Sequence, residues 1–158
     1  MVDPERGLVH PAEPLVGGRF GGYARATVTD IDRLIIPFSA LDVTKHAEEF
    51  VGADHGDVPF SIILVHAPTG GGPKVHRHPY AEVFIVESGE ATFTLGEATR
   101  VVSSGHVVIG PPEVAHGFMN SGAGELRLIA IHGAPRFITE WLPGGDATWT
   151  SPPKRESS

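Results

Sequence analysis

Three residues in one short segment have the types and spacing of metal ligands. His76 and His78 lie two residues apart, so on a strand their side chains point to the same face. Glu82 has the same parity, but a straight strand would place it about 13 Å beyond His78. Because all ligands of one metal ion must reach within about 2.0–2.2 Å of it, the chain must bend between them. Pro79 stands where such a bend is expected.

A fourth ligand is expected from His116, which follows the Pro111-Pro112 turn and begins another short strand. The set then offers three imidazoles and one carboxylate. Such donors suit Fe, Mn, Ni, Co or Zn, and they are poor for Ca or Mg, which prefer oxygen ligands. The sequence therefore predicts a divalent transition metal held by four residues: His76, His78, Glu82 and His116.

Two further residues near this site carry groups that can transfer protons. Tyr80 lies in the bend between the ligands, and His132 ends an apolar strand, where it could lie close to the metal site. With Glu82 they are the predicted catalytic residues. The plainer alternatives are that Tyr80 is an exposed loop residue and His132 a structural histidine.

Three residues are candidates for substrate binding. Phe118 and Asn120 share the parity of His116 and should face the same cavity, and His66 lies on a neighbouring apolar strand. The alternatives stay open for all three: Phe118 as core packing, Asn120 as a structural hydrogen-bonding residue and His66 as a structural histidine.

Composition limits the classes of protein and partner. At 158 residues, with 41% hydrophobic and 20% charged residues, the chain has the make-up of a single soluble globular domain. The formal net charge of −7 and the lack of a basic cluster predict no nucleic-acid partner. No apolar run approaches the roughly 18 residues of a membrane span. The polar N-terminal sequence has no signal-peptide pattern, so a cytoplasmic location is predicted. The absence of cysteine excludes disulfides, thiolate nucleophiles and cysteine metal sites.

Short runs of β-branched residues separated by turn signals indicate an all-β fold. Twenty glycines and fourteen prolines punctuate the chain at short intervals, a spacing typical of a sandwich or barrel. The absence of an internal repeat favours one barrel over two. The expected strands are residues 61–66, 82–87, 91–95, 101–102, 106–109 and 125–132.

The barrel is expected over residues 56–136, with additional segments of the same domain on either side. Before it, in residues 1–55, we expect an extended arm over 8–22, a strand over 33–38, and a short helix or turn segment over 39–50. After it, residues 137–158 are expected to form a helical turn over 138–142 and a frayed tail from 150.

The expected strands 107–109 and 126–131 are apolar on both faces. A barrel with one wet face should instead alternate apolar and polar residues. Some outer surface must therefore be covered, by the N-terminal arm or by a second subunit, and we predict a homodimer formed through sheet contacts.

The two ligand segments resemble the two motifs of the cupin family. The first matches G-x5-H-x-H-x3-E-x6-G at every position, and the second matches G-x5-P-x-G-x2-H-x3-N except at Glu113, where the family usually has glycine. The matching positions are Gly70, His76, His78, Glu82 and Gly89, then Gly105, Pro111, His116 and Asn120. The resemblance implies a conical double-stranded β-helix (jelly-roll) barrel, open at one mouth. It also implies a metal inside, with coordination positions left for water or substrate.

The same resemblance implies several possible reactions, since the family includes dioxygenases, isomerases, decarboxylases, lyases and polyketide cyclases, and fold does not choose among them. The apolar strands predict a small organic substrate with an aromatic or aliphatic body and a chelating pair of oxygens. Dioxygenase-type oxidation is slightly favoured because the donor set suits iron or manganese. The alternatives are a non-redox cyclase, isomerase, decarboxylase or lyase, a purely structural metal, and a non-enzymatic small-molecule-binding barrel.

Overall fold

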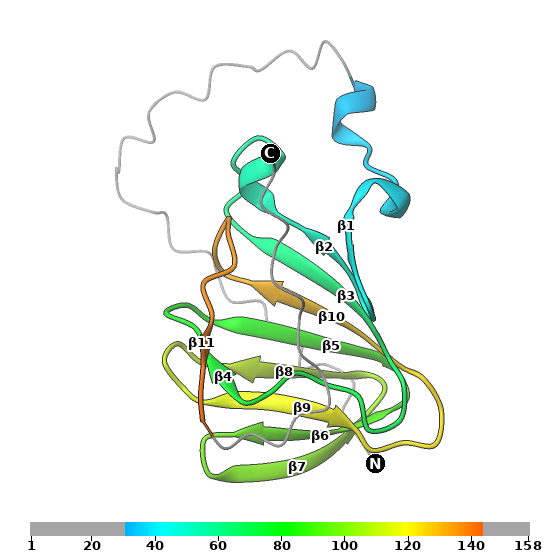
Figure 1. The fold of residues 1–158 in the computed structure, drawn as a ribbon, viewed down its shortest axis with the longest axis vertical. Helices are drawn as coiled ribbons and strands as arrows, with labels where there is room; N and C mark the ends of the chain where they lie inside the picture. The colour runs from blue at the N-terminus through cyan, green and yellow to red at the C-terminus, as the bar shows by residue number, and fades with distance from the viewer. Residues whose placement is uncertain (1–30, 144–158) are drawn as a thin grey trace, which may run out of the picture. The chain divides into compact units, whose positions relative to one another are not determined.

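The structure of the protein is a computed structural model that describes residues 31–143 (Figure 1). The chain divides into two compact units, residues 1–35 and 36–158. The first contributes one described element, a 3-10 helix. In chain order the elements are η1 (Ile31–Leu34), η2 (Phe38–Ala40), β1 (Asp42–Thr44), β2 (Ala47–Phe50), η3 (Gly52–Asp54), β3 (Ser61–Ala67), β4 (His76–Arg77), β5 (Glu82–Ser88), β6 (Glu90–Leu95), β7 (Ala98–Ser103), β8 (His106–Gly110), β9 (His116–Asn120), β10 (Leu126–His132) and β11 (Glu140–Trp141).

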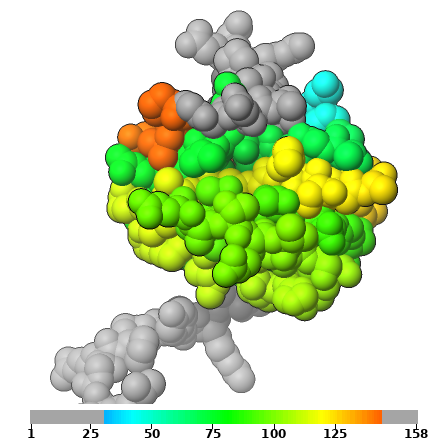
Figure 2. All heavy atoms as spheres, turned by 90° about the horizontal axis from the view of Figure 1, so that it is seen from below, coloured from blue at the N-terminus to red at the C-terminus, as the bar shows by residue number. Residues whose placement is uncertain are grey.

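The strands of the second unit form two antiparallel sheets. One has six strands in the order β1-β2-β3-β10-β5-β8, and the other has five in the order β11-β4-β9-β6-β7. Strands adjacent in the sheets are often distant in the chain, as Figure 1 shows for β3 beside β10. Seen from below, the surface consists largely of the green-to-yellow middle part of the chain (Figure 2). The predicted all-β, double-stranded β-helix architecture is confirmed.

Alternation of side chains builds the core between the sheets. Along β5, for example, Glu82, Phe84 and Val86 are buried, while the residues between them are more accessible. Aromatic rings join the two sheets: the ring of Phe84 lies edge-on to those of Phe93 and Phe118, with centroids 5.3 and 5.8 Å apart. The six predicted barrel strands are all present, with ends shifted by up to three residues.

Before the barrel, the structure differs from the expected elements. Residues 33–38 form no strand, since they lie at the end of η1 and the start of η2. Of the helix or turn segment expected over residues 39–50, residues 39 and 40 end η2, and the rest forms the β1–β2 hairpin, with its turn at residues 45 and 46. The physical reason is tertiary: β2 pairs with β3 over four residues, so the sheet satisfies its backbone groups. A local pattern of residues in the sequence contains no information on this pairing with another strand.

After the barrel, the helical turn expected over residues 138–142 is also wrong. Glu140 and Trp141 form β11, which pairs with Arg77 and His76 of β4. The N–H of Leu142 donates to the carbonyl oxygen of Val75 at 3.1 Å, which extends the pairing. Cross-strand hydrogen bonds thus replace the local bonds of a helical turn.

The outer face of the six-stranded sheet is apolar across four strands, two of which, β8 and β10, are the strands that the sequence indicates as apolar on both faces. Register partners form two rows on this face, each running from β8 through β5 and β10 to β3. At the β8 edge, Val107 and Ile109 are 63% and 59% exposed, which is unusual for large aliphatic side chains on adjacent positions of one face. The rows are Val107, Ile85, Ile129 and Leu64, and Ile109, Val83, Ile131 and Ile62.

The arm expected over residues 8–22 and the tail expected from residue 150 lie outside the described residues. Within residues 31–143, no helix has the length and apolar character needed to cross a membrane.

Candidate metal centre

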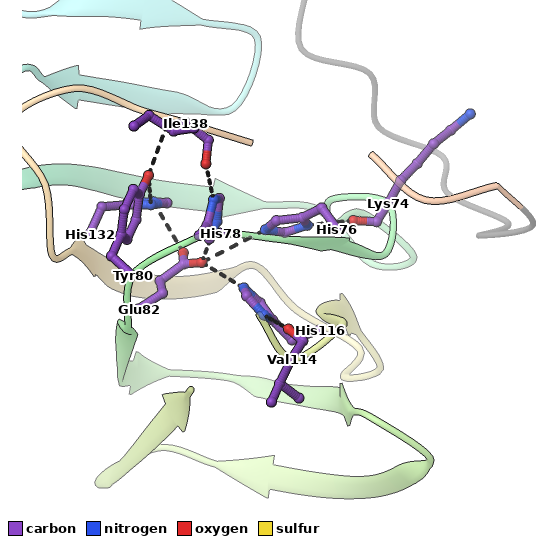
Figure 3. Close-up of polar contacts among 9 residues, drawn as sticks. All are labelled: Lys74, His76, His78, Tyr80, Glu82, Val114, His116, His132 and Ile138. Carbon is purple, nitrogen blue, oxygen red and sulfur yellow. Dashed lines mark hydrogen bonds and ion pairs between the residues drawn. The ribbon is translucent and has the colours of Figure 1, made fainter. Parts of the chain in front are cut away.

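The four predicted ligands converge between the two sheets (Figure 3). One ligand atom from each lies within 4.8 Å of the others. The Oε2 atom of Glu82 is 2.9 Å from Nε2 of His116, 3.0 Å from Nε2 of His78 and 3.7 Å from Nε2 of His76. All four residues are buried, with at most 4% of their surface exposed.

The topology explains why ligands from separate segments meet. His76 and His116 are register partners on β4 and β9 of the five-stranded sheet, whereas Glu82 begins β5 in the six-stranded sheet. The bend at Pro79 and Tyr80 carries the chain from one sheet to the other. The bend that the sequence requires at Pro79 is therefore where the chain changes sheets.

Each histidine ligand is oriented by a backbone carbonyl. The Nδ1 atoms of His76, His78 and His116 lie 2.6, 2.7 and 2.7 Å from the carbonyl oxygens of Lys74, Ile138 and Val114. A carbonyl oxygen only accepts, so each Nδ1 carries a proton and donates it. In the neutral ring, Nε2 then presents a lone pair to the centre. Such outer contacts typically fix the tautomer of a metal-binding histidine.

This arrangement fits a metal ion. Three Nε2 lone pairs and a carboxylate point at one another, and all of them are hydrogen-bond acceptors. A cation at their centre would satisfy all four. Moreover, Nε2 of His78 is fully buried and has no hydrogen-bond partner. Buried polar atoms without a partner are rare and call for an unseen ligand or ion. The donor set of three imidazoles and a carboxylate suits a divalent transition metal.

Without a metal, a proton on His116 supplies part of that positive charge. Burial raises the pKa of Glu82, but the surrounding histidines (His116, His132, His76 and His78) outweigh it and hold the pKa well below its usual range. Burial lowers the pKa of His116, but Glu82 and the Val114 carbonyl outweigh it and raise the pKa. In the metal-free centre, an ionised Glu82 therefore lies beside a His116 that holds a second ring proton more strongly than an ordinary histidine.

His132 and Tyr80 adjoin the ligands, as the sequence predicts. Nε2 of His132 lies 3.1 Å from Oε1 of Glu82, the oxygen turned away from the other histidines. Its Nδ1 is 3.4 Å from the Tyr80 hydroxyl, which accepts a hydrogen bond from the Ile138 N–H at 3.0 Å. Burial lowers the pKa of His132 despite the Glu82 carboxylate. Burial also raises the pKa of Tyr80. Both side chains are thus held neutral, and Tyr80 is half-buried rather than an exposed loop residue.

A glycine makes room for the His116 ring. Gly110 is the register partner of Glu82, and a Cβ atom added to it would meet the ring of His116 at 3.3–3.4 Å. That is tighter than ordinary van der Waals contact, so any side chain at this position presses on the ligand. The sequence offered no signal for this role, because Gly110 is one of twenty glycines.

Glu113 adopts the backbone conformation of the glycine that it replaces. Its φ angle of 63° lies in the left-handed region that favours glycine. Its N–H donates to the carbonyl oxygen of His78 at 2.8 Å, which ties the second motif to the first. The departure from the family pattern therefore leaves the turn intact.

A cavity of about 930 Å³ opens above the centre. Its lining includes His76, His78, Glu82 and His132, together with Phe118, which places this predicted substrate-binding residue at the cavity wall. Most of the remaining lining residues come from β1, β2, β3 and the segment after β10, among them Ile63, Val65, Phe137, Thr139 and Trp141.

Two predicted substrate-binding residues are not brought to this cavity. Asn120 donates from Nδ2 to the carbonyl oxygens of Ala67 and Gly124, both at 2.8 Å, and accepts from the Gly122 N–H. It therefore holds the loop that leads into β10. His66 lies on the outward-facing side of β3, with its ring nitrogens 3.2 Å from Glu48 and 3.8 Å from Glu125. Side chains alternate along β3, and His66 lies on the side opposite to Ile63 and Val65, which line the cavity.

Sequence reasoning missed the segment after β10. Phe137 packs edge-on against His132 with ring centroids 4.8 Å apart, and Trp141 lies 5.1 Å from His76. Ile138 contributes only backbone groups, so no side-chain pattern could have revealed it. Trp141 could be recognised in the sequence as a tryptophan, but its pairing with His76 of β4 could not be predicted from it.

The fold and the site together are those of a metal-binding β-barrel. Three histidines and one glutamate form a buried centre between the two sheets of a double-stranded β-helix. Residues 63–132 match the family described as the Cupin domain. All four ligands lie within these residues, so this part of the chain is similar to a cupin domain in sequence as well as in fold.

Individual relatives are distant. A Bacillus subtilis protein named H2HPP isomerase is 28% identical over 127 residues, covering 80% of this chain and 49% of that protein. The chain thus spans about half the length of this curated relative. A Klebsiella pneumoniae protein with a double-stranded β-helix domain superposes with a TM-score of 0.51 at 21% identity, covering 72% of this chain and 94% of that one. A recombinant oxalate oxidase in complex with glycolate superposes with a TM-score of 0.60 at 19% identity, covering 72% of this chain and 66% of that one. These structural likenesses show the shared fold.

Proposed function

We propose that this protein is a metal-dependent enzyme acting on a small organic substrate that chelates the metal through oxygen atoms. We further propose that its reaction is a proton transfer of the isomerase type. The observation that carries this proposal is the buried His132 at the cavity wall, held between Glu82 and Tyr80. A neutral imidazole beside a fixed carboxylate is a competent general base.

The roles of the residues follow from their positions. His76, His78, Glu82 and His116 would hold the ion, which could be Fe, Mn, Ni, Co or Zn. When bound, it supplies a Lewis acid that polarises a chelated carbonyl. A proton taken up by His132 is stabilised by Oε1 of Glu82 at 3.1 Å. The Tyr80 hydroxyl fixes the opposite ring nitrogen, and Phe118 supports the apolar body of the substrate.

The isomerase-named relative supports this choice, since it aligns with four fifths of the chain. Dioxygenase-type oxidation is the second candidate, because three imidazoles and a carboxylate also suit redox-active Fe or Mn. The two reactions differ in what they consume. Oxidation uses O2, whereas a proton transfer exchanges hydrogen with water.

The test incubates metal-loaded protein with small α-keto acids, 1,3-diketones and catechols in D2O. Deuterium incorporation next to the chelating carbonyl, measured by NMR without O2 consumption, is the expected result. His132→Gln should abolish it, while Glu125→Gln, which changes an exposed carboxylate on the outer face, should not. O2 consumption with oxidised product would favour the dioxygenase. Binding of these compounds with neither change would favour a non-enzymatic binding barrel.

We also propose that the protein is a homodimer. The support is the outer face of the six-stranded sheet, where two rows of aliphatic side chains cross four strands. A face of this kind marks an interaction site in a soluble protein. A second copy offers the same apolar rows in return, as a two-fold interface requires.

A further inference from the structure

The wall of the cavity consists of two chemically different parts. The aliphatic lining residues come mainly from the six-stranded sheet, with Ile63 and Val65 on β3 as examples. The phenyl and indole rings lie elsewhere: Phe118 is on β9, Trp141 is on β11, and Phe137 is in the segment between β10 and β11. Because β9 and β11 are the two neighbours of β4, the aromatic part of the wall surrounds the strand that begins the metal centre.

Two of these rings contact histidines of the centre directly. The ring of Trp141 is tilted by 51° against that of His76, with centroids 5.1 Å apart. The ring of Phe137 stands edge-on to that of His132, with centroids 4.8 Å apart. Rings in contact have centroids about 4.5–7 Å apart. A compound bound at the centre therefore has both rings beside the first atoms of its body.

The segment after β10 directs these rings into the cavity by alternation. Phe137, Thr139 and Trp141 line the cavity, whereas Ile138 and Glu140 between them do not. Alternate side chains of an extended segment point to opposite sides. The segment therefore presents its two rings on one side and its exposed residues on the other.

Trp141 is fixed in place although its side chain is not covered. Its backbone pairs in register with His76 of β4. The preceding residue, Glu140, accepts hydrogen bonds from the Arg77 guanidinium at 2.7 and 3.0 Å, and a bidentate pair of this kind holds a defined geometry. Trp141 nevertheless remains 48% exposed, although tryptophan is usually a well-buried residue. A fixed, open indole offers contact area to a ligand at little cost in conformational entropy.

An aromatic wall discriminates between flat and saturated rings. Two aromatic rings in edge-to-face or offset-stacked contact gain about fivefold in binding constant beyond the effect of burying their area. A saturated ring of the same size is more apolar, so burial alone would favour it. The direction of the preference therefore separates ring contacts from general hydrophobic burial.

We propose that the substrate carries an aromatic ring within about two bonds of its chelating oxygens, and that Trp141 and Phe137 are specificity-determining residues that bind this ring. The aliphatic wall, including Ile63 and Val65, contacts the rest of the body. This inference rests on the proposed function, because it takes the metal as the anchor of the chelating group. It implies that substrates with a saturated body bind less tightly.

Three hydroxamates with the same chelating group test the inference. They are phenylacetohydroxamic acid, cyclohexylacetohydroxamic acid and acetohydroxamic acid, which differ only in the ring. Calorimetric titration into the metal-loaded protein should give binding about fivefold tighter for the phenyl compound than for the cyclohexyl compound. Acetohydroxamic acid should bind most weakly, since it has no body. Equal or tighter binding of the cyclohexyl compound would overturn the inference.

Variants locate the preference in the two rings. Trp141→Leu should reduce it to less than about twofold, whereas Trp141→Phe retains a ring and should retain most of it. Phe137→Leu should also reduce it, and it gives the answer if Trp141→Leu does not load metal, because Phe137 packs on His132 rather than on one of the four ligands. Phe38→Leu removes a ring that is 65% exposed and outside the cavity lining, so it should leave the preference unchanged.

The compound without a ring controls for damage to the metal centre. Acetohydroxamic acid should bind the parent chain and the metal-loaded variants alike. A phenyl preference that stays at its parent value in both Trp141→Leu and Phe137→Leu would overturn the assignment to these residues. Failure of all three compounds to bind the loaded parent chain would instead count against the proposed function.

Discussion

The backbone carbonyl oxygen of Ile138 lies 2.7 Å from Nδ1 of His78, a residue 60 positions earlier in the chain. This contact makes the segment after β10 part of the metal centre, although it contributes no ligand. The same residue donates its N–H to Tyr80, and its neighbours Phe137 and Trp141 pack on His132 and His76. One short stretch of chain therefore positions two ligands and both proposed proton-transfer residues.

Removing that stretch should weaken metal binding. A chain ending at Arg136 loses the carbonyl that orients His78, and we expect its metal affinity to fall by about 10–100-fold. Competition with a fluorescent chelator measures the effect. A chain ending at Pro143 keeps the contact and serves as the control. Equal affinities for the two truncated chains, with circular dichroism showing the barrel intact in both, would contradict a positioning role for Ile138.

Gly110→Ala should disturb the same centre from the opposite side. The added Cβ meets the His116 ring at 3.3–3.4 Å, so the ring must shift by a few tenths of an ångström. Because ligand distances are tightly constrained, we expect metal affinity to fall by about tenfold. Gly124→Ala is the matched control, since nothing lies within 4 Å of its added Cβ. If both variants bind metal like the parent chain, Gly110 has no role in shaping the centre.

Metal binding should become tighter as pH rises. The raised pKa of His116 means that the metal-free protein keeps a proton on Nε2 to higher pH than an ordinary histidine. The metal must displace that proton, so affinity increases with pH until His116 has titrated. Calorimetry in buffers of different ionisation enthalpy should detect proton release. Affinity independent of pH between 6 and about 8 would rule out this competition.

The stability of the metal-free protein should show the corresponding trend. The folded-state pKa of His116 lies above the unfolded value, so its contribution is present at low pH and is lost as pH rises through the folded pKa. The folded-state pKa of Glu82 lies below the unfolded value, so its contribution is lost in acid. We expect a maximum in Tm between these two limits, and metal loading should flatten its alkaline side.

The outer face of the six-stranded sheet should hold two copies together. Light scattering at micromolar concentration should give the mass of a dimer. Ile85→Lys/Ile129→Lys places two charges in the centre of the face and should give monomers that still bind metal. Thr92→Lys alters the outer side of the other sheet and should leave the dimer intact. A monomer mass for the parent chain would exclude this interface.

The ligands were predictable from sequence because their signals are local. The same-face spacing of His76 and His78 and the bend at Pro79 each follow from strand geometry. The six barrel strands were predictable for a similar reason, since turn residues bound each apolar run.

The rest depends on pairing between distant segments. β1, β2 and β11 are short, and each owes its extended conformation to a neighbouring strand. Ladder parity also decided which candidates reach the cavity. His66 sits on the outward side of β3, and only the register with β2 and β10 establishes which side that is. The Ile138 contact is made by backbone atoms and leaves no trace in residue type.

Metal content after loading tests the central claim most directly. The purified chain is exposed to Mn, Fe, Co, Ni or Zn ions in turn, exchanged into metal-free buffer and analysed by mass spectrometry. We expect about one ion per chain for at least one of these metals, and none in His76→Ala/His116→Ala. His66→Ala/His106→Ala removes two histidines outside the centre and should bind like the parent chain. Near-zero content in the parent chain, or unchanged content in His76→Ala/His116→Ala, would contradict a metal centre at these residues.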